Sequence, residues 1–224
     1  MDDAREMGTL RSAAIAFDLL TPGREDSDMS DRLRQILEAA VEVVGQYGFY
    51  GASLSQIADR VGVSKPGLLH YVVSKQNLLT MVLRHYYDET GAPAAFIGES
   101  AGAVLSGERK DLSLPRFYRM VAASNEERPA LVRMFSVLNA ESLDPDHPAH
   151  AYFERREGLL VTTMTSLPWV LPAGIDLDAI LLATHSAMDG VQVRWLRDPS
   201  RGLTSMWAAC EEALFPSPLW DGFR

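Results

Sequence analysis

The sequence has a single cysteine among its 224 residues, and it has little continuous hydrophobic character. One thiol cannot build a disulfide framework, so we interpret Cys210 as a small buried side chain in a protein of the reducing cytoplasm. No run reaches the roughly 18 apolar residues that a transmembrane helix needs, and we therefore expect no membrane partner. The acidic N-terminus also lacks the basic and apolar stretches of a secretory signal.

Several motifs of enzymes are absent as well. The chain has no G-x-S-x-G nucleophile elbow, no H-E-x-x-H zinc motif and no phosphate-binding G-x-x-x-x-G-K-[ST] loop. The stretch GVSKPG at residues 62–67 has the wrong spacing for the first of these. Alternation of β-branched and polar residues, which would indicate strands, is missing too. We predict an all-α protein that is not an enzyme and needs no cofactor.

What the sequence does contain is a pair of short predicted helices joined by a tight turn, between residues 53 and 79. Ser53 and Gln56 form a capping-box pattern, which marks the start of the first helix. Gly62 follows where a helix end favours a residue that tolerates positive φ. The apolar residues between them share one helix face: Leu54, Ile57, Ala58 and Val61.

The second short helix begins directly after this turn. Ser64 is its predicted cap, and Pro66 suits its first turn because the amide that proline lacks would have no partner there. Leu68 and Val72 continue the apolar face. The arrangement is typical of a helix-turn-helix that reads the major groove of DNA. The alternative interpretation is an ordinary pair of helices inside an all-helical domain.

The flanking segments favour the DNA-binding interpretation. A strongly periodic helix is predicted for residues 31–47, and Ser74 caps another helix that continues past Leu79. With these flanks, residues 32–80 resemble the tetracycline-repressor (TetR) family of bacterial regulators. The matching residues are Ile36, Ala39, Ala40, Tyr47, Gly48, Phe49, Ile57, Ala58, Gly62, Val63, Ser64, Lys65, His70, Tyr71, Ser74, Lys75, Leu78 and Leu79.

The chain departs from the family at a few positions of the predicted recognition helix. Leu69 stands where the family usually has an aromatic residue that often contacts phosphate, Pro66 where it has another residue, and Val72-Val73 where it has Phe-Pro or a similar pair. The replacements keep the apolar volume. The resemblance implies an N-terminal three-helix DNA-binding domain, followed by a helical domain for ligand binding and dimerisation.

The position of the motif assigns a set of DNA-contacting residues. The N-terminal part of a recognition helix reads bases, while neighbouring groups hold phosphates. Lys65 can donate to guanine or to a phosphate, and Leu69 can meet a thymine methyl group. We expect these residues to face the groove: Ser64, Lys65, Pro66, Leu69 and His70. We expect these to contact the phosphate backbone: Ser53, Ser55, Tyr71 and Lys75.

The charge of the chain is an argument against a nucleic-acid partner, because 21 basic residues face 30 acidic ones and the net charge is −9. The acidity lies outside the motif, however. Residues 30–80 carry five basic and four acidic side chains, whereas residues 1–29 carry three and seven. A DNA-binding segment with so little net charge should bind non-specific DNA weakly. It would therefore need the two copies of a dimer to gain affinity.

We divide the chain into a short N-terminal extension at 1–29, a DNA-binding domain at 30–74 and a helical regulatory domain at 75–217. Proline and glycine punctuate the last part into helix-sized segments. These are 94–106, 115–125, 129–143, 148–168, 176–197 and 200–214. In the family, the last two long helices form a four-helix dimer interface.

The segment 176–197 has an apolar face too wide for a single neighbour. We predict that it packs on its own domain and on the second subunit of a homodimer. The interface residues we assign are Ile180, Thr184, Ala187, Val191 and Trp195.

The resemblance also implies a cavity for a small-molecule effector in the helical domain. The candidate lining residues are Phe96, Phe117, Met120, Met134, Phe135, Phe153, Met164, Trp169 and His185. Arg119 and Arg133 are candidates for orienting an anionic effector. The alternative is that these side chains belong to an ordinary core or surface.

One acidic, histidine-bearing stretch at residues 144–154 suggests a metal site. Asp146, His147, His150 and Glu154 could converge on a divalent ion. We prefer a helix start, with Asp146 or His147 as cap and Pro148 in the first turn, and expect no metal.

These observations predict a cytoplasmic, homodimeric transcriptional regulator, most simply a repressor. It would bind a palindromic operator in double-stranded DNA and would be released by a small-molecule effector of unknown identity. The alternatives are a helical enzyme with a hydrophobic pocket, and an adaptor that keeps the shape of the head but binds protein.

Overall fold

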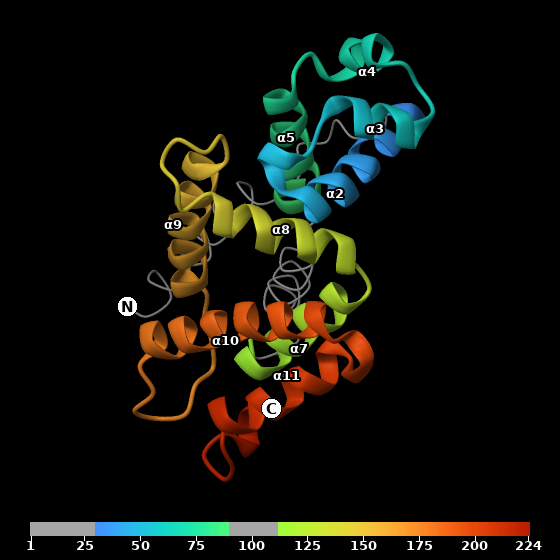
Figure 1. Cartoon of the computed structure of the whole chain (residues 1–224). Helices are drawn as coiled ribbons and strands as arrows, with labels where there is room; N and C mark the ends of the chain where they lie inside the picture. Colours follow the sequence, from blue (N-terminus) through green and yellow to red (C-terminus); the bar gives the residue numbers. More distant parts are fainter. Residues whose placement is uncertain (1–29, 90–111) are drawn as a thin grey trace. The chain divides into compact units, whose positions relative to one another are not determined.

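A computed structural model of the chain describes residues 30–89 and 112–224 (Figure 1). These residues form helices joined by short connections, and the part described contains no strand beyond a single bridge between Leu112 and Trp169. The predicted all-α fold is confirmed. Within the same ranges, no helix has the length and apolarity that crossing a bilayer would require. The predicted N-terminal extension, residues 1–29, lies outside the described residues.

The described residues divide into two compact units. Residues 30–89 and 129–157 form the head unit, and residues 112–128 and 158–224 form the C-terminal unit. The predicted boundary at 74/75 therefore does not separate these units. The reason is packing, because helices on both sides of that boundary share one hydrophobic core.

In the head unit, α2 (Asp31–Gly51) packs against α3 (Leu54–Val61), α5 (Lys75–Leu83) and α8 (Pro129–Glu141). The short helix α4 (Lys65–Val72) joins α3 to α5, and α5 continues as a π-helical segment, Arg84–Glu89. The α2–α8 pair is close: a Cβ on the buried Gly45 would lie 3.2 Å from the backbone N of Met134. The centre of this core contains the fully buried side chains of Ile36, Ala40, Ile57, Leu68, Val72, Met134 and Leu138.

In the C-terminal unit, α11 (Leu203–Leu214) packs on α7 (Leu114–Glu126) and on α10 (Leu177–Arg197). The helix α9 (His150–Ser166) begins in the head unit and ends in this one. Because Gly202 has no side chain to cap α11, Glu126 of α7 accepts hydrogen bonds from the Leu203 amide and the Thr204 hydroxyl, both at 2.7 Å.

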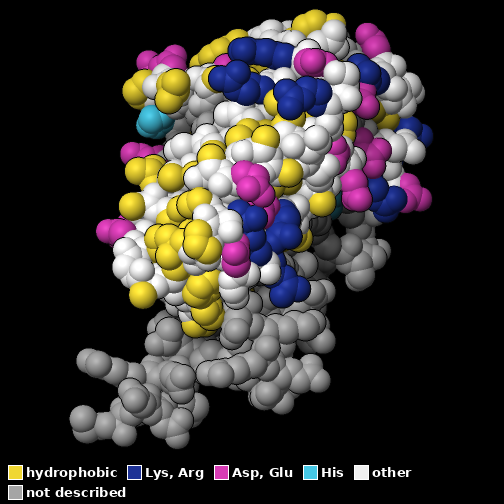
Figure 2. Space-filling view, turned by 90° about the horizontal axis from the view of Figure 1, so that it is seen from below, with side chains coloured by type: hydrophobic (Ala, Val, Ile, Leu, Met, Phe, Trp, Pro, Cys, Tyr) yellow, Lys and Arg dark blue, Asp and Glu magenta, His cyan; other side chains and the backbone are white. Residues whose placement is uncertain are grey.

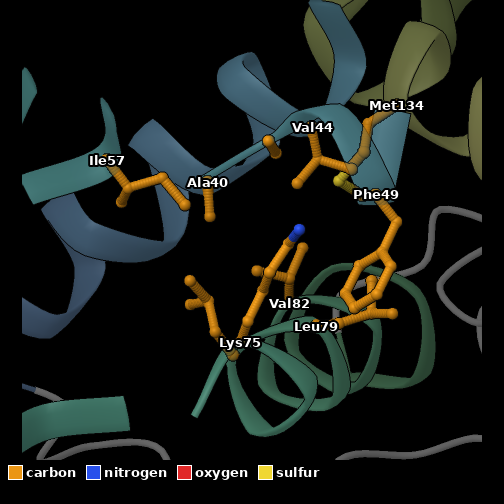
Figure 3. A pocket seen from close by; sticks show the side chains of 10 residues that line it. Ala40, Val44, Phe49, Ile57, Lys75, Leu79, Val82 and Met134 are labelled. Carbon is orange, nitrogen blue, oxygen red and sulfur yellow. The ribbon is translucent and has the colours of Figure 1, made fainter. Parts of the chain in front are cut away.

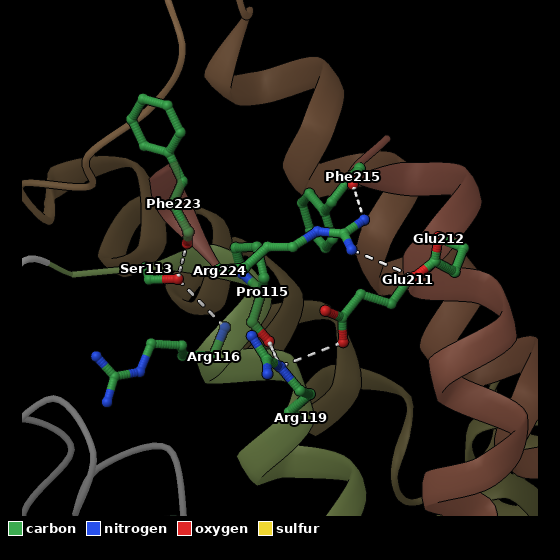
Figure 4. Close-up of polar contacts among 9 residues, drawn as sticks. All are labelled: Ser113, Pro115, Arg116, Arg119, Glu211, Glu212, Phe215, Phe223 and Arg224. Carbon is green, nitrogen blue, oxygen red and sulfur yellow. Dashed lines mark hydrogen bonds and ion pairs between the residues drawn. The ribbon is translucent and has the colours of Figure 1, made fainter. Parts of the chain in front are cut away.

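The C-terminal residues close this unit by polar contacts (Figure 4). The Ser113 hydroxyl donates to the Phe223 carbonyl at 2.5 Å, and Arg119 pairs with Glu211 at 3.3 Å. Burial raises the pKa of Glu211, and Arg119 opposes the shift. Arg224 pairs with Glu212 at 3.2 Å. Arg119, one candidate for orienting an effector, therefore has a carboxylate partner within the chain.

The later helices agree closely with the predicted segments. Four segments correspond to α7, α8, α10 and α11 within a few residues, and Asp176 caps α10. The segment 94–106 lies outside the described residues. The segment 148–168 corresponds to α9 but begins at His150, so neither Asp146 nor His147 is its cap. His147 instead is buried in the head unit, with 3% of its surface exposed.

Candidate nucleic-acid interface

The two short helices of the motif are held by local hydrogen bonds. The Ser53 hydroxyl accepts from the Gln56 amide at 3.2 Å, and the Gln56 side chain accepts from the Ser53 amide at 2.7 Å, which completes the predicted capping box. Gly62 ends α3 in the left-handed conformation, with φ +74°. Ser64 and Ser74 cap α4 and α5 as predicted, each accepting a backbone amide three residues ahead. These caps fix the turn between the helices.

The helix α4 presents one side to the core and the other to solvent. Leu68 and Val72 are both 0% exposed, so they hold α4 against the head unit. On the opposite side, Lys65, Pro66, His70 and Tyr71 are exposed and Leu69 is half-buried. The predicted contact residues Ser53, Ser55 and Ser64 are exposed as well. The structure thus leaves most of the predicted DNA-contacting side chains accessible.

The basic side chains of the head unit differ in whether they form an ion pair or hydrogen bond within the protein. Arg34 pairs with Asp31 at 3.0 Å, and Arg60 pairs with Glu42 at 2.5 Å. Arg32 donates to the Gln35 side chain and to the Val61 carbonyl. No hydrogen bond or ion pair among the described residues engages Lys65. Its ammonium group, at the first turn of α4, is therefore available to an external anion.

Lys75, the other lysine of the head unit, occupies a different environment at the first residue of α5. Its ammonium points among apolar side chains that line a small pocket between α2, α3, α5 and α8 (Figure 3). The nitrogen lies 4.4 Å from the centre of the Phe49 ring and 3.5 Å from the Tyr50 carbonyl oxygen. Burial lowers the pKa of Lys75, and the charge of Glu141 acts in the opposite direction. Lys75 is therefore a half-buried cation that already contacts the Phe49 ring and the Tyr50 carbonyl.

This pocket is too small for an effector. Its volume is about 10 Å³, which is space for roughly one water molecule. Of the residues predicted to bind an effector, only Met134 lines it.

The predicted effector residues are divided between the two units. Met134, Phe135 and Phe153 belong to the head unit, where the rings of Phe135 and Phe153 lie 5.0 Å apart. Arg133 is exposed on α8. Phe96 lies outside the described residues. The remaining candidates belong to the C-terminal unit: Phe117, Met120, Met164, Trp169 and His185.

Within the C-terminal unit, several of these candidates are in contact. The Phe117 and Trp169 rings lie 5.6 Å apart, and the Trp169 indole donates to the Met164 carbonyl at 2.7 Å. His185 Nδ1 lies 2.7 Å from the hydroxyl of the buried Tyr118. Burial raises the pKa of Tyr118, so this hydroxyl keeps its proton. The result is an aromatic cluster with one polar pair, and Tyr118 is a member that the sequence did not indicate.

The residues assigned to the dimer interface face mainly inward. Thr184 is 0% exposed, Val191 5% and Trp195 4%, while Ile180 and Ala187 are partly buried. The three buried side chains pack within their own protomer and leave little surface for a second subunit. The exposed residues of α10 include the small or apolar Ala179, Leu182, Ala183, Ser186, Gly190 and Val193 and the charged Asp178, Asp189, Arg194 and Arg197.

The side chains of the suspected metal stretch do not converge. His147 Nδ1 accepts a hydrogen bond from the Ala149 amide, and His150 Nδ1 lies 2.7 Å from the Ser142 carbonyl. Asp146 and Glu154 are exposed. Across residues 30–89 and 112–224, no group of three metal-binding side chains comes together.

The region of the helix-turn-helix motif is similar in sequence to known proteins. Residues 36–82 match the family model of bacterial regulatory proteins, tetR family. Over 73 residues the chain is 42% identical to the HTH-type transcriptional regulator RutR of Escherichia coli, a match that covers 33% of this chain and 34% of RutR. The chain thus aligns with about a third of the length of this curated relative.

Solved structures resemble the chain over a greater length. NalD, the secondary repressor of the MexAB-OprM multidrug efflux pump in Pseudomonas aeruginosa, superposes with a TM-score of 0.57 at 18% identity, covering 82% of this chain and 94% of NalD. The transcriptional regulator FadR from Bacillus subtilis, solved in complex with stearoyl-CoA, gives 0.51 at 17% identity, covering 81% and 96%. At these identities the likeness shows the fold.

Proposed function

We propose that the chain is a homodimeric, ligand-responsive transcriptional regulator that acts as a repressor in the cytoplasm. The match of residues 36–82 to the family model of bacterial regulatory proteins, tetR family, supports this proposal. The observation that carries this proposal is the difference in burial between the two sides of α4. Its inner side is fully buried, whereas its outer side is exposed and bears Lys65, a cation that the described protein leaves without a partner. Residues 30–74 would read the DNA.

The outer side of α4 suits a major groove. The groups at its N-terminal end, Ser64, Lys65 and Pro66, would meet base edges together with Leu69 and His70. The N-terminal end of α3, with Ser53 and Ser55, and the Tyr71 hydroxyl would contact phosphates. With one free lysine on each head, binding would depend on two heads reading a near-palindrome.

Fluorescence anisotropy with a labelled fragment from upstream of the protein's own gene tests this proposal. We expect saturable binding at low salt that an unlabelled specific fragment displaces and a scrambled one does not. The affinity should fall with salt, although less steeply than for strongly basic proteins, because few cations meet phosphates. Binding that is equal for every sequence, or absent at low salt, would refute the proposal and favour the protein-binding adaptor.

The exposed side of α10 supports a dimer interface different from the one assigned by sequence. Leu182 is 70% exposed and Val193 37%, and the exposed residues between them are three small ones, Ala183, Ser186 and Gly190, and the charged Asp189. The neighbouring helix α11 exposes Ser205, Ala208, Ala209 and Ala213. Figure 2 shows one face of the molecule, on which hydrophobic side chains gather beside charged ones. Small and apolar side chains allow the helices of two protomers to approach closely.

Replacing Leu182 with glutamate should dissociate this dimer. The substitution would place a charge in each half of a symmetric interface, so the change would be felt twice and association should weaken by at least about 100-fold. Analytical ultracentrifugation measures the effect. The matched control is Leu143→Glu, at an 82% exposed leucine of the head unit. If both variants remain dimers, α10 is not the interface.

For the effector, we propose the aromatic cluster of the C-terminal unit as part of the binding site. Phe117 and Trp169 would contact the apolar part of the ligand, and the Tyr118–His185 pair would bind its polar group. A ligand can release DNA only if it binds the DNA-free state better than the DNA-bound one. Native mass spectrometry after incubation with a metabolite extract, repeated with His185→Phe, identifies the ligand and tests this site.

A further inference from the structure

The end of α2 is held by a residue far away in the sequence. Gly48 interrupts the helix, with φ +70° and ψ 176°, and the chain then runs through Phe49 and Tyr50 to the start of α3. The interruption removes the helical partner of the Phe49 amide. That amide donates instead to Glu141 Oε2, at 2.7 Å and across 92 positions of sequence. We call residues 48–52 the connector.

The fit between Glu141 and the connector is close. A Cβ on Gly48 would lie 2.0 Å from Glu141 Oε1, so the carboxylate occupies the space that any other residue would fill. One carboxylate oxygen thus bonds the connector and the other lies against it. This arrangement requires both the absence of a side chain at 48 and a carboxylate at 141.

The buried His147 lies beside the Glu141 carboxylate. Its side chain is 0% exposed, and its Nδ1 accepts a hydrogen bond from the Ala149 amide at 3.1 Å. In the neutral ring, Nε2 therefore carries the proton. Nε2 lies 3.4 Å from Glu141 Oε2 and makes no hydrogen bond within the described residues. The rings of Phe49 and Tyr50 meet the imidazole edge-on, at 5.4 and 5.3 Å between centroids.

Lys75 holds the same connector at another point. Its ammonium lies over the Phe49 ring and near the Tyr50 carbonyl oxygen, as described above. The connector is thus fixed by an anion on α8 and a cation at the first residue of α5. Since Ser53 caps α3 directly after the connector, the direction in which the connector leaves α2 sets the direction of α3 and, through the Gly62 turn, of α4.

We propose that Glu141 is a positioning residue for operator recognition: by holding the connector from α8, it fixes the angle at which the motif leaves α2. This inference rests on the proposed function. Glu141 does not itself contact DNA. Its loss would misdirect α4 while leaving Lys65 and Tyr71 in place as chemical groups, so specific binding would suffer more than general attraction to phosphate.

The test compares Glu141→Ala, Glu141→Gln and Glu141→Asp with the full-length protein. The glutamine keeps an oxygen that accepts from the Phe49 amide, whereas alanine has no acceptor and aspartate is one methylene too short. We expect Glu141→Ala and Glu141→Asp to weaken operator binding by about tenfold or more, which is the effect of losing a well-placed base contact. Both variants should bind scrambled DNA as tightly as the original protein does. The Glu141→Gln variant should bind the operator with an affinity within about threefold of that of the original protein. Glu157→Ala, at an exposed glutamate of α9, is the matched control.

Hydrogen exchange of the segment 47–53 provides a readout that does not involve DNA. We expect faster exchange there in the alanine and aspartate variants, with circular dichroism unchanged. Should alanine prevent folding, the aspartate variant still decides the question. Exchange that speeds up while operator affinity stays unchanged would overturn the proposal, as would an equal loss of specific and scrambled binding. If the unsubstituted chain has no preferred DNA sequence, the proposed function itself fails, whatever the exchange shows.

Discussion

A chain in which Lys65 and Tyr71 are both replaced by alanine should lose sequence-specific DNA binding and keep its fold. Lys65 is the exposed cation of α4 that no described residue engages, and Tyr71 is 41% exposed on the same helix. A lost base or phosphate contact costs about 1–3 kcal/mol, and a dimer loses the contacts twice. We therefore expect the operator Kd to rise at least about 100-fold in an anisotropy titration.

The outcome must be separated from a loss of structure. Neither side chain contributes to the buried face of α4, which consists of Leu68 and Val72, so the melting temperature should change by no more than a few degrees. Arg155→Ala removes an exposed cation from α9 and should leave operator binding within about twofold. Retention of operator affinity by the double variant would exclude α4 as the recognition helix.

Replacing Gly48 with alanine should give the largest loss of stability of any single substitution considered. Its φ of +70° and ψ of 176° fall in a region that only glycine occupies readily, which costs another residue about 1–3 kcal/mol. The new Cβ would also displace the Glu141 carboxylate and leave the Phe49 amide without its acceptor, at a further cost of about 1–3 kcal/mol. Urea unfolding of the protein should show a loss of about 2–6 kcal/mol in the free energy of unfolding.

Gly62 supplies the comparison for this experiment. Its φ of +74° is similar, but its ψ of 37° places it in the ordinary left-handed region, and a Cβ there would meet nothing within 4 Å. Gly62→Ala should therefore cost only about 1 kcal/mol, the penalty of the backbone conformation alone. Equal losses for the two variants would mean that the contact with Glu141 contributes nothing.

The sequence predicted those features of the head that depend on neighbouring residues. Ser53, Ser64 and Ser74 bind backbone amides three residues ahead, and Gly62 ends a helix by its own conformation, so the local pattern contains the whole interaction. Their predicted roles as caps and turn are confirmed. Helix positions after residue 112 could be predicted for the same reason, since proline, glycine and apolar periodicity act locally.

The features that were missed depend on contacts between distant segments. The role of Glu141 requires knowing that α8 passes the end of α2, and the sequence gives no signal of this except a glycine at position 48. Lys75 is predicted to contact phosphate because it begins a helix, and nothing in the sequence indicated its contacts with the Phe49 ring and the Tyr50 carbonyl. In α10, periodicity indicated one wide apolar face but could not tell which part of it the protomer itself buries, and Thr184, Val191 and Trp195 proved to be buried.

The grouping of α8 with the head has a consequence for the construction of hybrid regulators. A designer who exchanges only residues 30–74 with those of another protein would transfer Gly48 and the Phe49 amide but leave Glu141 behind. The transplanted segment would then carry an unsatisfied amide beside a foreign side chain. Exchanging residues 129–150 together with 30–89 transfers the Phe49 amide and its acceptor Glu141 together. Hybrids made in this way should retain the operator preference of the protein that supplied these segments.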